Sequence, residues 1–207
     1  MEEILQAARQ LYLGLRRQPL PSYQRGHYQK IFASTARFIG IYGSRGVGKT
    51  TLMLQWLQQQ PEAESEKLYL SCDHAIFNGV NLFELLEHFA QQGGKVVVLD
   101  EIHQVQGFEQ ALKSAYDFLP LKIIFSGSSA IALTSADFAR RFAMFHLPQL
   151  SLREYIALET GIDCAPIELS ELLSSSIDCS ISVLDQLGDQ RILPLFQEYL
   201  AYGGYPF

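Results

Sequence analysis

The sequence predicts an α/β fold in which helices cover both faces of a parallel sheet, and three observations lead to this prediction. Short apolar segments alternate with amphipathic segments along most of the chain. The segment 96–99 is apolar at every position, as expected for a strand that is buried on both faces. Turns rich in Gly or Pro separate the segments, and this alternation is typical of a parallel sheet sandwiched by helices.

The expected elements follow from periodicity and from their end signals. Apolar residues at helical spacing predict a first helix over residues 1–17, followed by a loop or short helical turn over 19–36. Buried strands are expected at 37–42, 67–71, 96–99, 123–125 and 142–147. Further helices are expected at 49–60, 82–92, 107–118, 151–160, 168–175 and 192–202, with loops over the rest of 161–190. Asn81 with Glu84, and Ser151 with Glu154, form capping boxes that mark two of these helix starts.

Length, charge and cysteine content limit the class of protein. The 207 residues suit a core over residues 1–160, followed by a helical extension over 161–207 that begins a region otherwise absent. The net charge of −6 argues against nucleic-acid binding by this chain alone, because phosphate contacts need a basic surface. The chain has three cysteines without metal-ligand spacing, no signal peptide and no uncharged run long enough to span a membrane. We therefore expect a cytoplasmic protein.

The clearest motif is the segment 43–50, Gly-Ser-Arg-Gly-Val-Gly-Lys-Thr, which matches the phosphate-binding pattern G-x-x-x-x-G-K-[ST]. Its glycines let the backbone approach a triphosphate, and the N–H groups of the loop and of the following helix form an anion site. The alternative reading is a glycine-rich turn with an incidental lysine. The nucleotide-binding residues expected here are Gly43, Ser44, Arg45, Gly46, Val47, Gly48, Lys49, Thr50 and Thr51.

Two carboxylates follow the apolar segment 96–99. Lys49 is expected to contact the β- and γ-phosphates, while Thr50 and Asp100 are expected to hold Mg²⁺. Glu101 is then free to orient and polarise the attacking water, because a carboxylate that is engaged with the metal is a poor base. The alternative reading of Asp100 and Glu101 is a solvated acidic turn after a core strand.

Two more sets of residues are candidates for catalysis. Ser126 and Ser128 follow the strand at 123–125 and could contact the γ-phosphate or the water; alternatively, this Ser-rich run caps a helix. The sequence does not decide which serine acts. Arg140 and Arg141 could supply an arginine finger, with Arg141 preferred, or could be a surface pair beside a strand.

Several segments together resemble one family, the prokaryotic AAA-type ATPases of the STAND-like group. The segments that carry the resemblance are the phosphate-binding loop with Thr51 and Leu52, Leu-Asp-Glu-Ile-His at 99–103, Leu112-Lys113 with Tyr116-Asp117, Phe-Ser-Gly-Ser-Ser at 125–129, Arg140 with Arg141, Leu-Ser-Leu-Arg-Glu-Tyr at 150–155 and Gly-Gly-Tyr-Pro at 203–206. The resemblance covers nearly the whole chain. It is most specific between residues 141 and 155.

The resemblance implies a three-layer αβα P-loop NTPase fold with strand order 5-1-4-3-2, so that the strand of Ser126 lies between those of Lys49 and Asp100. It implies ATP rather than GTP, and it assigns Arg141 to a finger that acts within the chain or on a neighbour. Family chains continue beyond the Gly-Tyr-Pro segment, so this chain is expected to be the ATPase domain alone.

The sequence therefore predicts an AAA-type switch ATPase that uses ATP and Mg²⁺ and turns over slowly. An unidentified protein partner or self-association is expected. The alternative is a nucleotide-binding interaction module with little turnover, acting through a protein partner or a DNA-linked assembly. No membrane association is expected.

Overall fold

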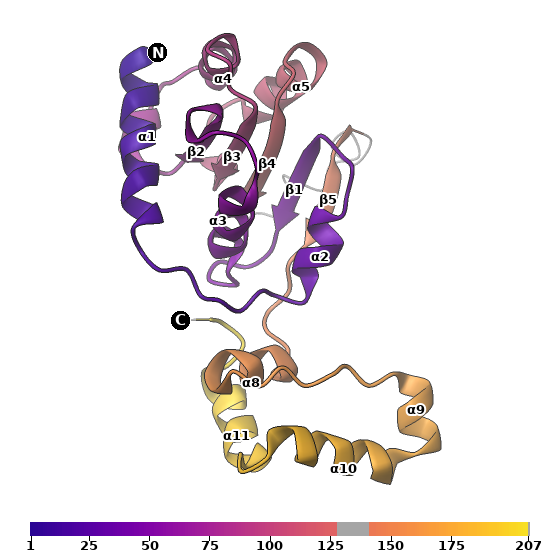
Figure 1. Ribbon diagram of the computed structural model, residues 1–207. Helices are drawn as coiled ribbons and strands as arrows, with labels where there is room; N and C mark the ends of the chain where they lie inside the picture. The colour runs from indigo at the N-terminus through magenta and orange to yellow at the C-terminus, as the bar shows by residue number, and fades with distance from the viewer. Residues whose placement is uncertain (128–140, 207) are drawn as a thin grey trace. The chain divides into compact units, whose positions relative to one another are not determined.

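The computed structural model describes residues 1–127 and 141–206 of the protein. The first part of the chain is built around a five-stranded parallel sheet (Figure 1). The strands lie in the order β2-β3-β4-β1-β5, which is the predicted order 5-1-4-3-2 in the opposite direction. The three-layer α/β prediction is confirmed. The strands are β1 (Phe38–Tyr42), β2 (Lys67–Ser71), β3 (Val96–Asp100), β4 (Lys122–Gly127) and β5 (Ala143–His146).

Helices cover both faces of the sheet. Helix α3 (Lys49–Gln59) packs on one face, and α4 (Leu82–Gln91) and α5 (Phe108–Phe118) pack on the other (Figure 1). Helix α1 (Glu2–Arg16) lies beside the edge strand β2. The predicted short helical turn is α2 (His27–Phe32). The described residues of this part also form the 3₁₀ turns η1 (Glu64–Glu66), η2 (Ala75–Phe77) and η3 (Ile102–Gln104).

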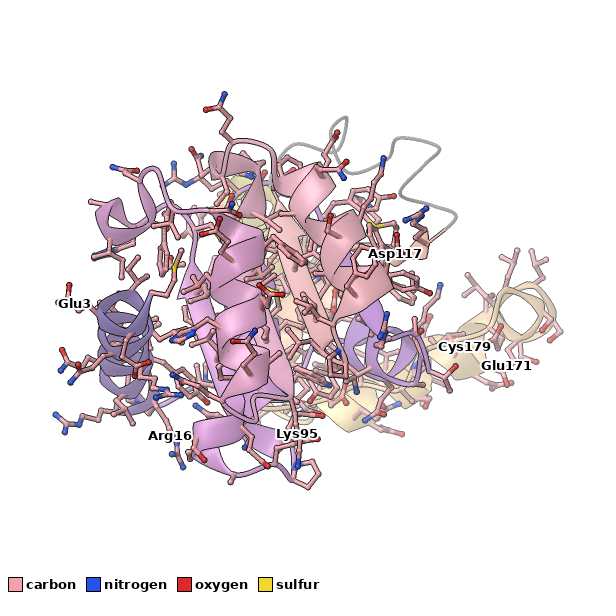
Figure 2. All side chains as sticks on the ribbon, turned by 90° about the horizontal axis from the view of Figure 1, so that it is seen from above. Glu3, Arg16, Lys95, Asp117, Glu171 and Cys179 are labelled. Carbon is pink, nitrogen blue, oxygen red and sulfur yellow. The ribbon has the colours of Figure 1, made fainter. Side chains whose placement is uncertain are left out.

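The apolar runs of the sequence become strands because both of their faces are covered. Val97 and Leu99 of β3 are fully buried and belong to one cluster with Leu85 and Leu86 of α4 and Leu112 of α5. Ion pairs connect segments at the amino ends of strands β2 and β3. Arg16 pairs with Glu64 of η1 at 3.1 Å, and Lys95 pairs with Glu66 at 2.7 Å; Figure 2 labels both basic residues. Since all five strands are parallel, the carboxyl ends of β1, β3 and β4 meet at the opposite edge, where ligands bind in such sheets.

The chain divides into two compact units, residues 1–148 and 149–207. The second unit contains α8 (Leu152–Thr160), α9 (Leu169–Ser174), α10 (Ser176–Leu187) and α11 (Ile192–Tyr202). Its first helix begins at the predicted capping box, in which Ser151 Oγ accepts a hydrogen bond from the Glu154 N–H at 3.3 Å. The division lies after Pro148, whereas the sequence suggested a boundary after Thr160; the functional division at 160 stays a prediction.

The loops expected over most of 161–190 are wrong, because residues 176–187 form the twelve-residue helix α10. Serines and β-branched residues give this segment low helix propensity. Tertiary packing overrides that preference: Leu187 and Val183 of α10 join a small cluster with Ile156 and Cys164. The expected short helix before it is present as α9. None of the helices in 1–127 or 141–206 is long and apolar enough to cross a membrane.

Candidate functional site

The glycine-rich loop connects β1 to α3 at the carboxyl edge of the sheet. Gly46 (φ 84°) and Gly48 (φ 93°) adopt the left-handed conformation, which explains why glycine occupies both positions. A side chain at Gly43 would collide with the Leu147 carbonyl oxygen, because a Cβ there would lie 2.3 Å from it. The loop can therefore close tightly only with glycine at these positions.

Helix α3 begins at Lys49 and directs its amino end into this loop. Its first intrahelical bond runs from the Leu52 N–H to the Gly48 carbonyl oxygen at 3.0 Å. The N–H groups of Lys49, Thr50 and Thr51 therefore have no acceptor within the helix, and Gly48 has no side chain to cap them. Such an exposed set of helix N–H groups, together with the helix dipole, forms an anion site.

Lys49 is buried, with 4% of its surface exposed, and its ammonium group lies within the loop. Nζ donates to the carbonyl oxygens of Gly43 at 3.1 Å and Ser44 at 3.0 Å. The same Nζ lies 3.8 Å from Glu101 Oε1. The lysine thus carries a positive charge to the mouth of the loop, next to a carboxylate.

Asp100 is the last residue of β3, and its carboxylate accepts hydrogen bonds from hydroxyl groups of three other elements. Thr50 Oγ1 donates to Oδ2 at 2.6 Å, and the Tyr69 hydroxyl of β2 donates to the same oxygen at 3.0 Å. The Ser126 hydroxyl of β4 donates to Oδ1. Burial and the adjacent Asp100 charge raise the pKa of Tyr69 well above its ordinary value, so the phenol stays protonated and remains a donor. These donors hold the carboxylate in one orientation.

Glu101 follows Asp100 in an unusual backbone conformation. With φ 52° and ψ 43°, it is the one residue other than glycine with positive φ in the described ranges. Its N–H donates to Ser126 Oγ at 3.1 Å, and its Oε2 lies 3.5 Å from His103 Nδ1. A non-glycine residue in this region costs about 1–3 kcal/mol, and such residues cluster at functional sites. The turn directs the carboxylate back toward Lys49.

The structure brings together five of the residues singled out from the sequence: Lys49, Thr50, Asp100, Glu101 and Ser126. Ser126 is fully buried, and its hydroxyl contacts Asp100 and the Glu101 N–H within the protein. Ser128, like Arg140, lies outside the described residues. The contact of either serine with phosphate or water stays a prediction.

Arg141 lies away from this group. It precedes β5, whose Ala143 pairs with Ile39 near the start of β1, so it lies at the sheet edge opposite the glycine-rich loop. Strands rise about 3.3 Å per residue, which separates the two edges by the full length of β1. Arg141 Nη1 instead pairs with Asp117 of α5 at 2.9 Å (Asp117 is labelled in Figure 2). This arrangement does not bring Arg141 to the loop of its own chain, and the finger role stays a prediction.

Two contacts of the site were missed from the sequence. Tyr69 lies in an apolar strand, where an aromatic residue is typical of core packing, and only the strand order brings it to Asp100. Arg25 precedes α2 and reaches the loop through the Val47 carbonyl oxygen at 2.8 Å. The sequence signal that could have indicated Arg25 is a lone charged residue in a segment that leads into the core.

A comparison with protein families assigns the chain to one of them. The model of the AAA domain family matches residues 35–156, and the chain belongs to this family. A curated but uncharacterized protein of Methanocaldococcus jannaschii, MJ1637, is 30% identical over 177 residues, which cover 81% of this chain. The chain spans 37% of the length of that relative.

Two solved structures are similar to this chain at low sequence identity. The Walker-type ATPase PABY2304 of Pyrococcus abyssi is 16% identical with a TM-score of 0.45, covering 86% of this chain and 71% of that chain. A variant of Thermotoga maritima RuvB is 17% identical with a TM-score of 0.43, covering 76% of this chain and 49% of that chain.

Proposed function

We propose that this AAA domain binds ATP with Mg²⁺ and slowly hydrolyses the bond to its γ-phosphate, which gives ADP and phosphate, as the ATPase part of a molecular switch. The observation that carries the proposal is the contact between Thr50 and Asp100, 2.6 Å apart, at the start of α3. It joins the helix that follows the glycine-rich loop to the end of β3. Lys49 and Glu101 flank this contact, so groups for phosphate, metal and water lie at one place.

The residues present fit a magnesium–triphosphate group. Glycine at positions 43, 46 and 48 lets the loop adopt its tight path, and the start of α3 offers N–H groups to phosphate oxygens. The Thr50 hydroxyl has one proton and two lone pairs. Because the proton goes to Asp100, a lone pair is left to face a cation. Hydroxyl and carboxylate oxygens are the ligands that Mg²⁺ prefers.

In the proposed mechanism, each residue has one task. The N–H groups of α3 and the Lys49 ammonium bind the phosphates, and Thr50 with Asp100 would hold Mg²⁺, Asp100 through a water molecule. Bound Mg²⁺ would neutralise negative charge on the phosphates. Glu101 would orient a water molecule and accept its proton. Ser126 would hold the Asp100 carboxylate and the backbone of Glu101, since its hydroxyl donates to Asp100 and accepts from the Glu101 N–H. Membership of the AAA family supports ATP as the nucleotide.

Removing the metal tests this proposal directly. Chelation with EDTA should stop phosphate release, and Asp100→Asn should raise the Mg²⁺ concentration that supports half-maximal turnover by roughly 10–100-fold, the range for loss of an outer-shell metal partner. The assay is phosphate release during a Mg²⁺ titration at saturating ATP. The matched control is Asp73→Asn, since Asp73 also follows a strand at this edge but contacts Ser71. Turnover that is insensitive to EDTA would rule out the mechanism.

A second candidate function, a nucleotide-binding module that acts through a protein partner, is favoured by the surface of the second unit. Ile177, Ile181 and Leu184 lie on one face of α10, and each is more than half exposed. The segment 154–190 contains eight Asp or Glu residues and no Lys or Arg. Large exposed apolar faces mark interaction sites, and this charge favours a basic amphipathic helix as the partner over a second copy of the same acidic face.

A pair of helical peptides tests this module. A Leu/Lys amphipathic peptide should bind the protein, whereas the same peptide with Glu in place of Lys should not, because of like-charge repulsion. The double substitution Ile177→Ser with Ile181→Ser should reduce binding about tenfold or more, as expected when two exposed apolar contacts are lost. Phe118→Ser is the control, since Phe118 is 77% exposed on α5 in the other unit. Fluorescence anisotropy reports binding; equal affinity for both peptides would contradict the proposal.

A cytoplasmic location is also part of the proposal. It is supported by the cysteines, because Cys72, Cys164 and Cys179 are free thiols, as is usual in a reducing compartment. Self-association, which would allow Arg141 to act on a neighbouring chain, also remains a proposal.

A further inference from the structure

The segment that leads from α1 to α2 is hydrogen-bonded to α3, the helix that follows the glycine-rich loop. Gln55 of α3 donates through Nε2 to the carbonyl oxygens of Pro21 at 2.7 Å and Tyr23 at 2.9 Å. Two residues later, Arg25 turns into the protein and is only 7% exposed. A side chain that is so strongly charged is rarely buried to this extent unless it has specific acceptors.

Arg25 uses its planar fork to bind two backbone segments that are far apart in sequence. Nη1 donates to the Val47 carbonyl oxygen, inside the glycine-rich loop, at 2.8 Å. Nη2 donates to the Pro148 carbonyl oxygen, just after β5, at 3.0 Å. The second segment is also bound to the end of β1, directly before the loop, because Leu147 N–H donates to the Tyr42 carbonyl oxygen at 2.8 Å. The guanidinium therefore joins the loop to the segment that follows β5.

The bond to Val47 has a consequence for the next residue. A peptide group is planar and trans, so its C=O and N–H point in opposite directions. When Arg25 holds the Val47 carbonyl oxygen, it also sets the direction of the Gly48 N–H. Gly48 adopts a left-handed conformation here. Because glycine lacks a Cβ, it could also adopt other conformations, in which this peptide group would have a different orientation. An external contact is what selects one orientation.

We infer that Arg25 is a positioning residue that keeps the Gly48 N–H directed at a nucleotide phosphate. The inference rests on the proposed ATP-binding function and goes beyond it by naming the group that orders the loop before the nucleotide arrives. Pre-ordering a binding loop raises affinity because less conformational freedom is lost on binding. Arg25 touches neither phosphate nor metal in this role.

The test compares two arginines that make similar bonds. Arg37 also donates to two backbone carbonyl oxygens, those of Leu119 and Tyr116, but at the opposite edge of the sheet. Arg25→Ala and Arg37→Ala should both lower the melting temperature. Only Arg25→Ala should raise the Kd for Mg-ATP, about tenfold, the effect of losing one charge-assisted hydrogen bond. Isothermal titration calorimetry and thermal melts supply the two readouts.

Chemical rescue separates positioning from general stability. Low millimolar guanidinium should restore part of the ATP affinity of Arg25→Ala and leave Arg37→Ala and the unsubstituted protein unchanged. If Arg25→Ala does not fold, Arg25→Lys replaces it, with an intermediate loss of affinity expected because lysine lacks the planar fork. Equal ATP affinity in Arg25→Ala and the unsubstituted protein would overturn the inference alone. Absence of ATP binding by the unsubstituted protein would overturn the proposed function as well.

Discussion

Replacing Glu101 by Gln is expected to lower ATP turnover by about 10²–10⁴-fold, the usual contribution of a general base, while ATP binding is retained. The amide has nearly the same shape, but it cannot accept the proton of the attacking water. Glu101 lies 3.8 Å from Lys49 and is partly exposed, so its side chain faces the mouth of the loop rather than the core. Single-turnover phosphate release measures the chemical step, and calorimetry measures the affinity for ATP.

The control for this variant is Glu109→Gln, which changes an exposed carboxylate in the first turn of α5. It should leave turnover unchanged. Thermal melting of Glu101→Gln should stay close to that of the unsubstituted protein, because the residue keeps its backbone bond to Ser126. Unchanged turnover in Glu101→Gln would remove Glu101 from the mechanism and would favour the interaction-module function.

The second large effect is expected for Lys49→Ala, which should weaken ATP binding by roughly 10²–10³-fold. Two charge-assisted hydrogen bonds to phosphate oxygens contribute about 3–4 kcal/mol together, and each 1.4 kcal/mol is tenfold in affinity. The loop carbonyl groups of Gly43 and Ser44 would also lose their donor, so the loop itself becomes less ordered. Equilibrium binding of a fluorescent ATP analogue, followed by competition with ATP, reports the change.

Lys67 provides a matched control for the lysine. It is buried to the same extent as Lys49, 4% exposed, but it begins β2 at the opposite edge and pairs with Glu64 at 3.4 Å. Lys67→Ala should therefore reduce stability without changing the affinity for ATP. If Lys49→Ala binds ATP as tightly as the unsubstituted protein, the glycine-rich loop is not a phosphate site and the alternative reading of an incidental lysine is correct.

The elements that were predicted well are those with a strong local pattern. Strand β3 is apolar at four successive positions, and its observed bounds extend the expected strand by only Asp100. Capping side chains located the starts of α4 and α8, because Asn81 and Ser151 accept N–H groups of the first turn in the structure. The sequence did not predict helix α10, because its serines lower the helix propensity and interrupt the apolar pattern. Its packing in the cluster that contains Ile156 favours the helix.

The part of the candidate site that the sequence predicted is likewise the part with a local pattern. The roles proposed for Lys49 and Asp100 rest on short motifs, and the structure brings these residues to one edge of the sheet. The partners of Asp100 come from β2 and β4, so they depend on the strand order and register rather than on any local spacing. The place of Arg141 at the other edge likewise depends on where β5 starts relative to β1.

By itself, the sequence determined the glycine-rich loop, the acidic pair at the end of a buried strand and the alternation of strands and helices. These features are local, because backbone conformation, hydrogen-bond capping and burial of a strand impose requirements on neighbouring residues. Only the tertiary structure decided that Tyr69 and Ser126 orient Asp100, and that Arg25 reaches Val47. Those contacts join residues far apart in the chain, and packing of the sheet and of the segments around it selects which of them meet.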